Sequence, residues 1–174
     1  MNEENYLQPT LENDLVLIRP LEVGDFDAVY QAASDPEIWE QHQNPDRWEK
    51  SVFKTFFDGA MASKGAFAII DKKSGRIIGS SRFRIANAES KAIEIGWTFL
   101  SKAFWGGTYN RSFKGLMIEH AHQYFDVVLF NVNKYNLRSQ KAVGKLGGEL
   151  IDKTGPLGHL HTEKEDGLTF AIRK

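Results

Sequence analysis

The sequence predicts an α/β protein, a single domain over residues 1–174 in which a mixed sheet is covered by helices on both faces. Three observations lead to this fold class. The predicted order of elements is strand, helix, helix, three strands, helix, strand, helix and two strands. The apolar pattern changes from period two to period 3.6 between residues 94 and 124. The run VVLFNV, residues 127–132, is continuously apolar, as in a strand covered on both faces.

The chain begins with a polar segment. Residues 1–13 are expected to form a loosely held N-terminal arm. A strand follows at residues 15–18. Asp25 is then the expected N-cap of a first helix, which closes before Asp35-Pro36. The apolar face of this helix consists of Phe26, Val29, Tyr30 and Ala33.

A second helix is expected to begin at Asn44-Pro45, because asparagine is a good N-cap and proline suits the first helical position. Its apolar face comprises Trp48, Val52, Phe53, Phe56, Phe57 and Ala60. Such an aromatic stripe more often packs into a core than lines a ligand site. A meander of three strands follows, with the first two at residues 66–71 and 76–85.

The third strand of the meander opens the stretch from Glu94 to Tyr124, around which the chain is organised. Ile93, Ile95, Trp97 and Phe99 are expected on one strand face, with Glu94, Gly96 and Thr98 on the other. The loop WGGTYN (105–110) and a helix follow. The start of a helix has unpaired N–H groups and the positive end of the helix dipole, which suit a pyrophosphate. Adjacent glycines also serve tight turns, and the loop matches neither GxxxxGK[ST] nor GxGxxG.

Beyond the central helix, the strand at residues 127–132 leads to a short helix capped by Asn136, with Gly147 at its C′ position. Its outer face carries Arg138, Lys141 and Lys145. This basic stripe is either solvated surface or a contact for phosphate. Residues 149–153 and 168–173 are expected to supply the last strands, with a polar loop between them.

Composition restricts the class of partner. The 174 residues carry a net charge of −1, so no global field favours nucleic acid or an anionic membrane. Cysteine is absent, which excludes disulfides, thiolate metal sites and a cysteine nucleophile, and no metal is expected. The N-terminus lacks the pattern of a signal peptide. We therefore expect a soluble, cytoplasmic protein, either a monomer or a homodimer.

The order of elements, with the motifs WGGTYN and NLRSQKAVGKLGG in these places, resembles the GNAT superfamily of acyl-CoA-dependent N-acetyltransferases. The resemblance covers nearly the whole chain, from LVLIRPLEVGDFDAVY to the final strand. The branch of ribosomal-protein N-terminal acetyltransferases typically shows phrases such as LRPL, IGW or IGY, and N..S....KLG, and it is most similar to this chain, which has IRPL, IGW and NLRSQKAVGKLG in these places. This resemblance implies a mostly antiparallel sheet, with a splayed strand pair that holds acetyl-CoA.

The resemblance also implies where acetyl-CoA binds. Phe99 and Leu100 would contact pantetheine, Asn136 would contact the cofactor or an ordered water, and Arg138 and Lys141 would lie near the phosphates. The pyrophosphate cradle would comprise Trp105, Gly106, Gly107, Thr108, Tyr109 and Asn110. The family loop is (Q/R)xxGx(G/A), however, and Thr108 stands at its glycine position. Because threonine does not adopt a positive φ cheaply, either the loop has another shape or the cofactor is held differently.

The catalytic candidates are Ser139 and Glu94. Val143 stands where many members of the family use a tyrosine as general acid, and Ser139 matches the serine attributed to the ribosomal-protein branch. Helix capping is the alternative role for both Ser139 and Asn136. Glu94 is either a general base or, equally, a cross-strand partner for Arg82 or Arg84. Weaker candidates for the base are His161 and Glu163.

The sequence therefore predicts an acetyl-CoA-dependent N-acetyltransferase. Its acceptor would be a peptide N-terminus or a small-molecule amine, and the acetyl group would pass directly in a ternary complex. The alternative is a CoA-binding module of the same fold with little or no transferase activity, which the altered loop and the missing tyrosine favour. A nucleotide-hydrolysing enzyme is disfavoured because the loop has no Walker lysine.

Overall fold

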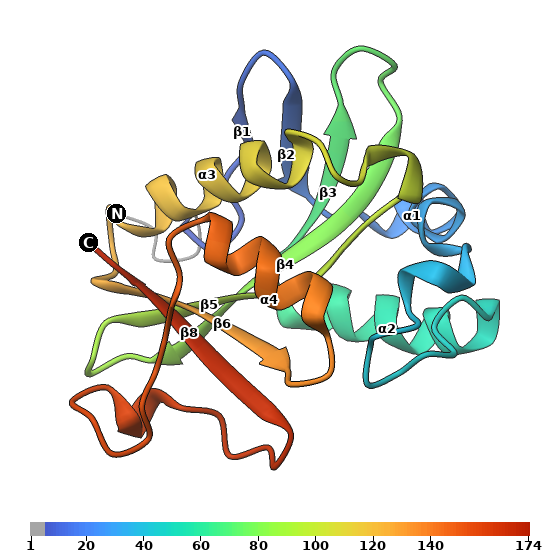
Figure 1. Ribbon diagram of the computed structural model, residues 1–174. Helices are drawn as coiled ribbons and strands as arrows, with labels where there is room; N and C mark the ends of the chain where they lie inside the picture. Colours follow the sequence, from blue (N-terminus) through green and yellow to red (C-terminus); the bar gives the residue numbers. More distant parts are fainter. Residues whose placement is uncertain (1–5) are drawn as a thin grey trace.

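The computed structural model describes residues 6–174. They form a single α/β domain around an eight-stranded sheet in the order β1-β2-β3-β4-β5-β6-β8-β7 (Figure 1). Neighbouring strands are antiparallel except β5 and β6, which run parallel. The predicted α/β class with a mixed, mostly antiparallel sheet is confirmed.

The bounds of the elements follow the predicted order. The strands are β1 (Leu11–Glu12), β2 (Val16–Pro20), β3 (Ala66–Asp71), β4 (Ile77–Asn87), β5 (Ala92–Leu100), β6 (Val127–Asn133), β7 (Glu149–Leu150) and β8 (Gly167–Arg173). The α-helices are α1 (Phe26–Ala33), α2 (Lys50–Ser63), α3 (Tyr109–Ala121) and α4 (Leu137–Lys145). Among residues 6–174, no helix is long and apolar enough to cross a membrane.

Two apolar clusters place the helices on opposite faces of the sheet. Phe113 of α3 and Val143 of α4 are buried with one set of strand side chains, including Ile93 and Ile95. Helices α1 and α2 bury the other set, and they contribute Val29, Phe53 and Phe57 to it. Because each cluster removes large apolar side chains from water, both helix pairs are fixed to the sheet.

The N-terminal segment is packed, in place of the loosely held arm expected for residues 1–13. The Tyr6 ring meets the Phe125 ring edge-on at 5.7 Å, and the Tyr6 carbonyl lies 2.8 Å from Nε2 of His120. Leu11–Glu12 pairs with β2 as a short edge strand. Only the described residues, from Tyr6 onward, support this correction, and residues 1–5 lie outside them.

Helix α2 begins at Lys50, later than the expected start at Asn44-Pro45. Residues 44–49 form turns instead, with the Glu49 amide donating to the Asp46 carbonyl at 2.9 Å. The Tyr30 hydroxyl donates to the Trp48 carbonyl at 3.1 Å, which holds this segment against α1. Tertiary contacts therefore outweigh the local capping signal.

Candidate active site

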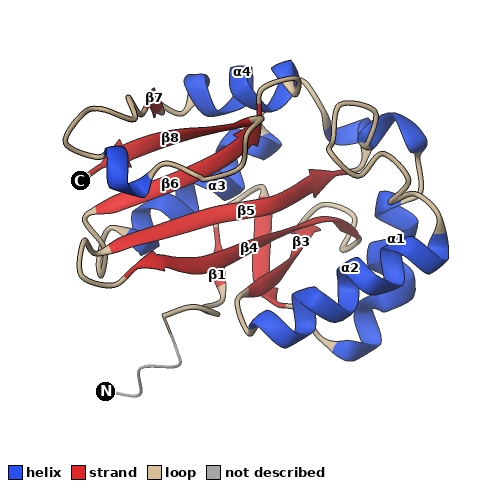
Figure 2. Ribbon diagram, turned by 90° about the horizontal axis from the view of Figure 1, so that it is seen from below, coloured by secondary structure: helices blue, strands red, loops and turns tan. Residues whose placement is uncertain are grey.

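Strands β5 and β6 separate along their length. They pair only over Ala92–Glu94 and Val127–Leu129. Beyond this point β5 continues beside β4, and β6 continues beside β8. Figure 2 shows the two strands diverging from their shared end. The splayed strand pair that the resemblance implied is therefore present, and its two inner edges have no strand partner.

A β-bulge interrupts β5 at the opening. Arg82 lies opposite Gly96 and Ser80 lies opposite Phe99, so Trp97 and Thr98 together face Ser81. Trp97 has a φ of 52°, in the left-handed region. This conformation is unfavourable by about 1–3 kcal/mol for a residue other than glycine. Bulges are common beside active sites.

The predicted alternation of side chains along β5 is wrong beyond the bulge. Ile95 packs on the α3 face, but Phe99 packs on the opposite face, 5.3 Å from the Trp39 ring. The extra residue of the bulge inverts the order of faces, so Phe99 does not share a face with Ile95. Because the Phe99 and Leu100 side chains are only 4% and 6% exposed, their contact with pantetheine would have to come from the backbone.

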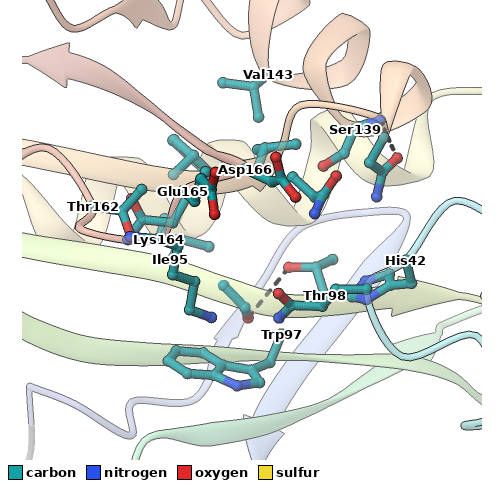
Figure 3. Close-up of a pocket in the computed structure, with 18 of the residues that line it drawn as sticks. His42, Ile95, Trp97, Thr98, Ser139, Val143, Thr162, Lys164, Glu165 and Asp166 are labelled. Atoms are coloured by element: carbon teal, nitrogen blue, oxygen red, sulfur yellow. Dashed lines mark hydrogen bonds between the residues drawn. The ribbon is translucent and has the colours of Figure 1, made fainter.

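A cavity of about 470 Å³ lies between the separated strands. Figure 3 shows Ser139 and Val143 of α4 on one side, with Trp97 and Thr98 of β5 across from them. Residues Thr162 and 164–167 close another side, and His42 lies at one end. A cavity of this size, at the point where strands part, is a suitable place for a small ligand.

The start of α4 brings several predicted residues together. The Asn136 side chain accepts a hydrogen bond from the Ser139 amide at 3.0 Å, so it caps the helix as the alternative interpretation held. Asn136, Ser139 and Val143 all line the cavity. The catalytic role of Ser139 stays a prediction, and the structure adds that its side chain lies at the cavity wall.

Lys114 is a cavity residue that the sequence analysis missed. It is 6% exposed, and its Nζ lies 4.7 Å from the centre of the Phe130 ring. Burial lowers the pKa of Lys114 to about 7. A signal was present in the sequence, because Lys114 stands three residues before Met117 and seven before Ala121, on the apolar stripe of the helix.

His42 was also missed, since it lies in a segment that offered no motif. It lines the cavity, and its Nδ1 is buried without a hydrogen-bond partner. Burial, together with the charge of Arg47, lowers the pKa of His42 to about 4. The imidazole is therefore neutral near pH 7.

Glu94 has the cross-strand arrangement that was the alternative to a base. Its Oε2 accepts from Nε and Nη2 of Arg84, at 2.8 and 2.5 Å. Its Oε1 lies beside Gly96, where an added Cβ would come within 3.2 Å of it. Glu94 is buried and is not part of the cavity wall, whereas Gly96 is. The base role stays a prediction. His161 and Glu163 also lie outside the described cavity lining.

The loop 105–108 makes its turn at a glycine. Gly106 takes the left-handed conformation with a φ of 68°, whereas Thr108 has a φ of −83°. The positive φ therefore lies two residues before the family's glycine position, and Thr108 is not strained. An added Cβ at Gly107 would find only the Trp105 carbonyl oxygen, at 4.0 Å, so the space beside the loop is open. Helix α3 follows at once, with its unpaired N–H groups and Asn110 in its first turn.

Side chains fix this loop to its neighbours. Trp105 donates from Nε1 to the Leu100 carbonyl at 2.9 Å, and Tyr109 donates its hydroxyl to Asp71 at 2.9 Å. The Arg138 guanidinium lies 4.0 Å from the centre of the Trp105 ring. Arg138 therefore lies beside the loop, and Lys141 follows it three residues along α4. Their contact with phosphate stays a prediction.

Comparison with known proteins gives consistent matches. A family model described as an acetyltransferase (GNAT) domain matches residues 16–149. A GCN5-related N-acetyltransferase from Brucella melitensis has a TM-score of 0.80 at 17% identity, over 95% of this chain and 79% of its own. A putative ribosomal-protein-serine acetyltransferase from Vibrio cholerae has a TM-score of 0.75 at 10% identity, over 95% and 98%. Mycobacterium smegmatis RimJ, solved in complex with CoA-disulfide, has a TM-score of 0.65 at 16% identity, over 91% and 81%.

Proposed function

Because the chain belongs to the GNAT acetyltransferase family, we propose that it transfers the acetyl group of acetyl-CoA to a primary amine. The acceptor is a peptide N-terminus or a small-molecule amine, and the transfer is direct, in a ternary complex. The observation that carries this proposal is the cavity between β5 and β6, with the bulge on one wall and Ser139 on another. A CoA-binding module would use the same cavity, so only catalysed release of CoA separates the two.

The residues around the splayed strands fit the donor. Acetyl-CoA supplies its acetyl group as an activated thioester. Gly106 turns the loop, Gly107 leaves room beside it, and the first amides of α3 would hold the pyrophosphate. The unpaired edge of β5 at the bulge offers backbone N–H groups that can polarise a carbonyl placed beside them.

The amine needs little help to lose its proton if it is an α-amino group. With a reference pKa of about 7.7–8.0, about a tenth of such amines are neutral at pH 7, compared with well under 1% of lysine amines. Proximity in the cavity can then supply much of the rate. Glu94 is the proposed base, acting through Oε1 beside Gly96, because Oε2 is occupied by Arg84.

Two side chains on the cavity wall can supply a proton to the leaving thiolate. Val143 cannot do so, although many members of the family have a tyrosine at its place. We propose the Ser139 hydroxyl as the proton donor, the role that the sequence analysis predicted for it. Lys114 is a second candidate, because an acid with a pKa near the working pH transfers protons efficiently.

Acetyl-CoA is expected to raise the melting temperature, because a ligand at about 100 times its dissociation constant adds about 2.7 kcal/mol to stability. Gly107→Val should weaken that binding by about tenfold or more, since losing one charge-assisted hydrogen bond costs about 1.5–3 kcal/mol. Thermal shift and calorimetry with acetyl-CoA measure both effects.

Gly24→Val is the matched control, because Gly24 also has open space around its Cα and lies before α1, away from the loop. It should bind acetyl-CoA like the unchanged protein. Normal binding by Gly107→Val would place the pyrophosphate elsewhere. No thermal shift in the unchanged, folded protein would remove the proposed donor.

A further inference from the structure

A second hollow, of about 490 Å³, adjoins the cavity between β5 and β6. The Trp97 side chain belongs to the walls of both. The same segment of chain also borders both, with His42 at the cavity and Arg47 at the hollow. We name this hollow the arginine groove, because Arg47 and Arg82 are the charged residues that line it. Trp97 therefore stands between the cavity and the groove.

Arg82 is a buried cation whose Nε has no partner. The residue is 8% exposed, and among residues 6–174 it forms no ion pair with a carboxylate. Charged side chains are almost never this buried unless they are paired. Burial and the charge of Arg47 lower the pKa of Arg82 to about 10, against the opposing influence of Glu94, so it stays protonated near pH 7.

Arg47 places a second cation in the same groove. Its one hydrogen bond within the described chain runs from Nη2 to the Asn44 side chain, at 3.2 Å. Burial lowers the pKa of Arg47, and the nearby charge of Asp46 partly opposes this shift without forming an ion pair. Two guanidinium groups that repel each other are thus kept together, which favours an anion between them.

Aromatic rings cover the faces of both guanidinium groups. Arg82 lies 4.5 Å from the Trp97 ring centre, and Arg47 lies 4.7 Å from that of Phe56. Stacking satisfies the flat faces and leaves in-plane N–H groups for a ligand. Glu94, the carboxylate whose charge acts on Arg82, is already held by Arg84. Within residues 6–174, therefore, no carboxylate forms an ion pair with Arg47 or Arg82.

The groove lies on the face of the sheet that α1 and α2 cover. Phe56 of α2 and Arg82 pack on the face of the sheet opposite α3, whose N-terminus would hold the CoA pyrophosphate. An oxyanion bound there would consequently belong to the acceptor and not to CoA.

We propose that the acceptor amine carries a carboxylate or phosphate group, which Arg47 and Arg82 bind in the arginine groove while the amine reaches the cavity past Trp97. This inference rests on the proposed acetyl transfer and narrows its substrate class. Guanidinium groups bind both oxyanions with paired hydrogen bonds, so the shared chemistry is an oxyanion a short distance from a primary amine.

The test compares amines that differ only in the anionic group: butylamine, γ-aminobutyrate and aminopropylphosphonate. A second pair of acceptors, peptides with aspartate or asparagine after the first residue, distinguishes a peptide source from a small molecule. We expect kcat/KM to be about 10- to 100-fold higher for the anionic acceptor of a set than for its neutral counterpart. Arg47→Gln and Arg82→Gln should each reduce this preference to about threefold or less.

Lys54→Gln is the control for loss of one positive charge, because Lys54 is an exposed residue of α2 outside the groove and pairs with Asp58. It should keep the preference. If Arg82→Gln does not fold, Arg47→Gln alone tests the proposal. Arg47 belongs to the loop before α2, so its substitution should leave the fold intact. Equal kcat/KM for neutral and anionic acceptors, or an unchanged preference in a folded arginine variant, would overturn the proposal.

A binding measurement separates this proposal from acetyl transfer itself. Butyrate has no amine, so it can bind the groove but cannot be acetylated. We expect it to raise the melting temperature of the unchanged protein and of Lys54→Gln, but not of Arg47→Gln. No shift, or the same shift in all three, would overturn the groove even if butylamine is acetylated. A selective shift without acetylation of any amine would uphold the groove and reject the transferase.

Discussion

Lys114→Met is expected to raise the free energy of unfolding by about 4 kcal/mol at pH 7. Burial lowers the pKa of Lys114 from 10.5 in the unfolded chain to about 7. Each unit of that difference corresponds to about 1.4 kcal/mol, and methionine fills a similar volume without a charge. This would be a large gain for one substitution in a protein of this size.

The direction of the Lys114 pKa shift predicts how the stability gain of Lys114→Met depends on pH. Between pH of about 7 and 10.5 the unfolded chain keeps the Lys114 proton that the folded chain has lost, so the unchanged protein becomes more stable as pH rises. The advantage of Lys114→Met should therefore be complete below pH of about 7 and nearly absent at about 10.5. Urea unfolding at several pH values measures this.

Lys54→Met is the control, since the exposed Lys54–Asp58 pair should contribute less than about 1 kcal/mol at any pH. A difference between Lys114→Met and the unchanged protein that does not vary with pH would show that Lys114 titrates normally. The buried Lys114 lowers the stability of the protein, and we expect that it contributes to catalysis. The kcat of Lys114→Met, measured on the same samples, shows whether this second candidate donor contributes.

Ser139→Ala is expected to lower kcat by a factor of about 10 to 1,000, with a smaller effect on the KM for acetyl-CoA. A serine hydroxyl is a weak acid, so its contribution must come from a hydrogen bond that strengthens as charge develops on sulfur. Such an interaction acts mainly in the transition state and therefore affects kcat. Steady-state kinetics with acetyl-CoA varied at saturating amine gives both constants.

The helix cap at α4 makes a stability control necessary. Asn136 accepts from the Ser139 backbone amide, which alanine retains, so the cap should survive and the folded fraction should stay the same. Ser34→Ala removes an exposed hydroxyl that donates to the Gln31 carbonyl, and should leave kcat unchanged. An unimpaired Ser139→Ala would move the acid role to Lys114 or to water.

Much of the fold could be predicted from periodicity and caps. The continuous apolar run of β6 correctly indicated a covered strand, and Asn136 caps α4 as expected. The change of period around the WGGTYN loop correctly predicted α3, although the helix begins at Tyr109 and includes the last two residues of the predicted loop. These features are local, because each depends on a few neighbouring residues whose preferences agree with the fold.

Features that depend on the partner strand could not be predicted in the same way. The bulge at Trp97 is set by its register against β4, and it inverts the face of Phe99. Phe99 was therefore assigned to the wrong face. Period-two reasoning assumes an unbroken ladder, and a single extra residue defeats it.

The groove and the late start of α2 share a physical cause. Arg47 stacks on Phe56 from a turn that local capping rules assign to the helix, so its position depends on tertiary contacts. Lys114 gave a clearer signal, since a lysine interrupts an apolar stripe. Whether such a residue reaches solvent or ends in a cavity depends on where β5 and β6 separate, which the sequence does not show.

The most direct test of acetyl transfer is the initial rate of CoA release while acetyl-CoA and an amine acceptor are both varied. Direct transfer in a ternary complex predicts release that depends on the amine, with double-reciprocal lines that intersect. Parallel lines would indicate a covalent acetyl-enzyme and contradict direct transfer. Acetyl-CoA that binds but releases CoA no faster with any amine than without one would contradict the proposed function and leave a CoA-binding module.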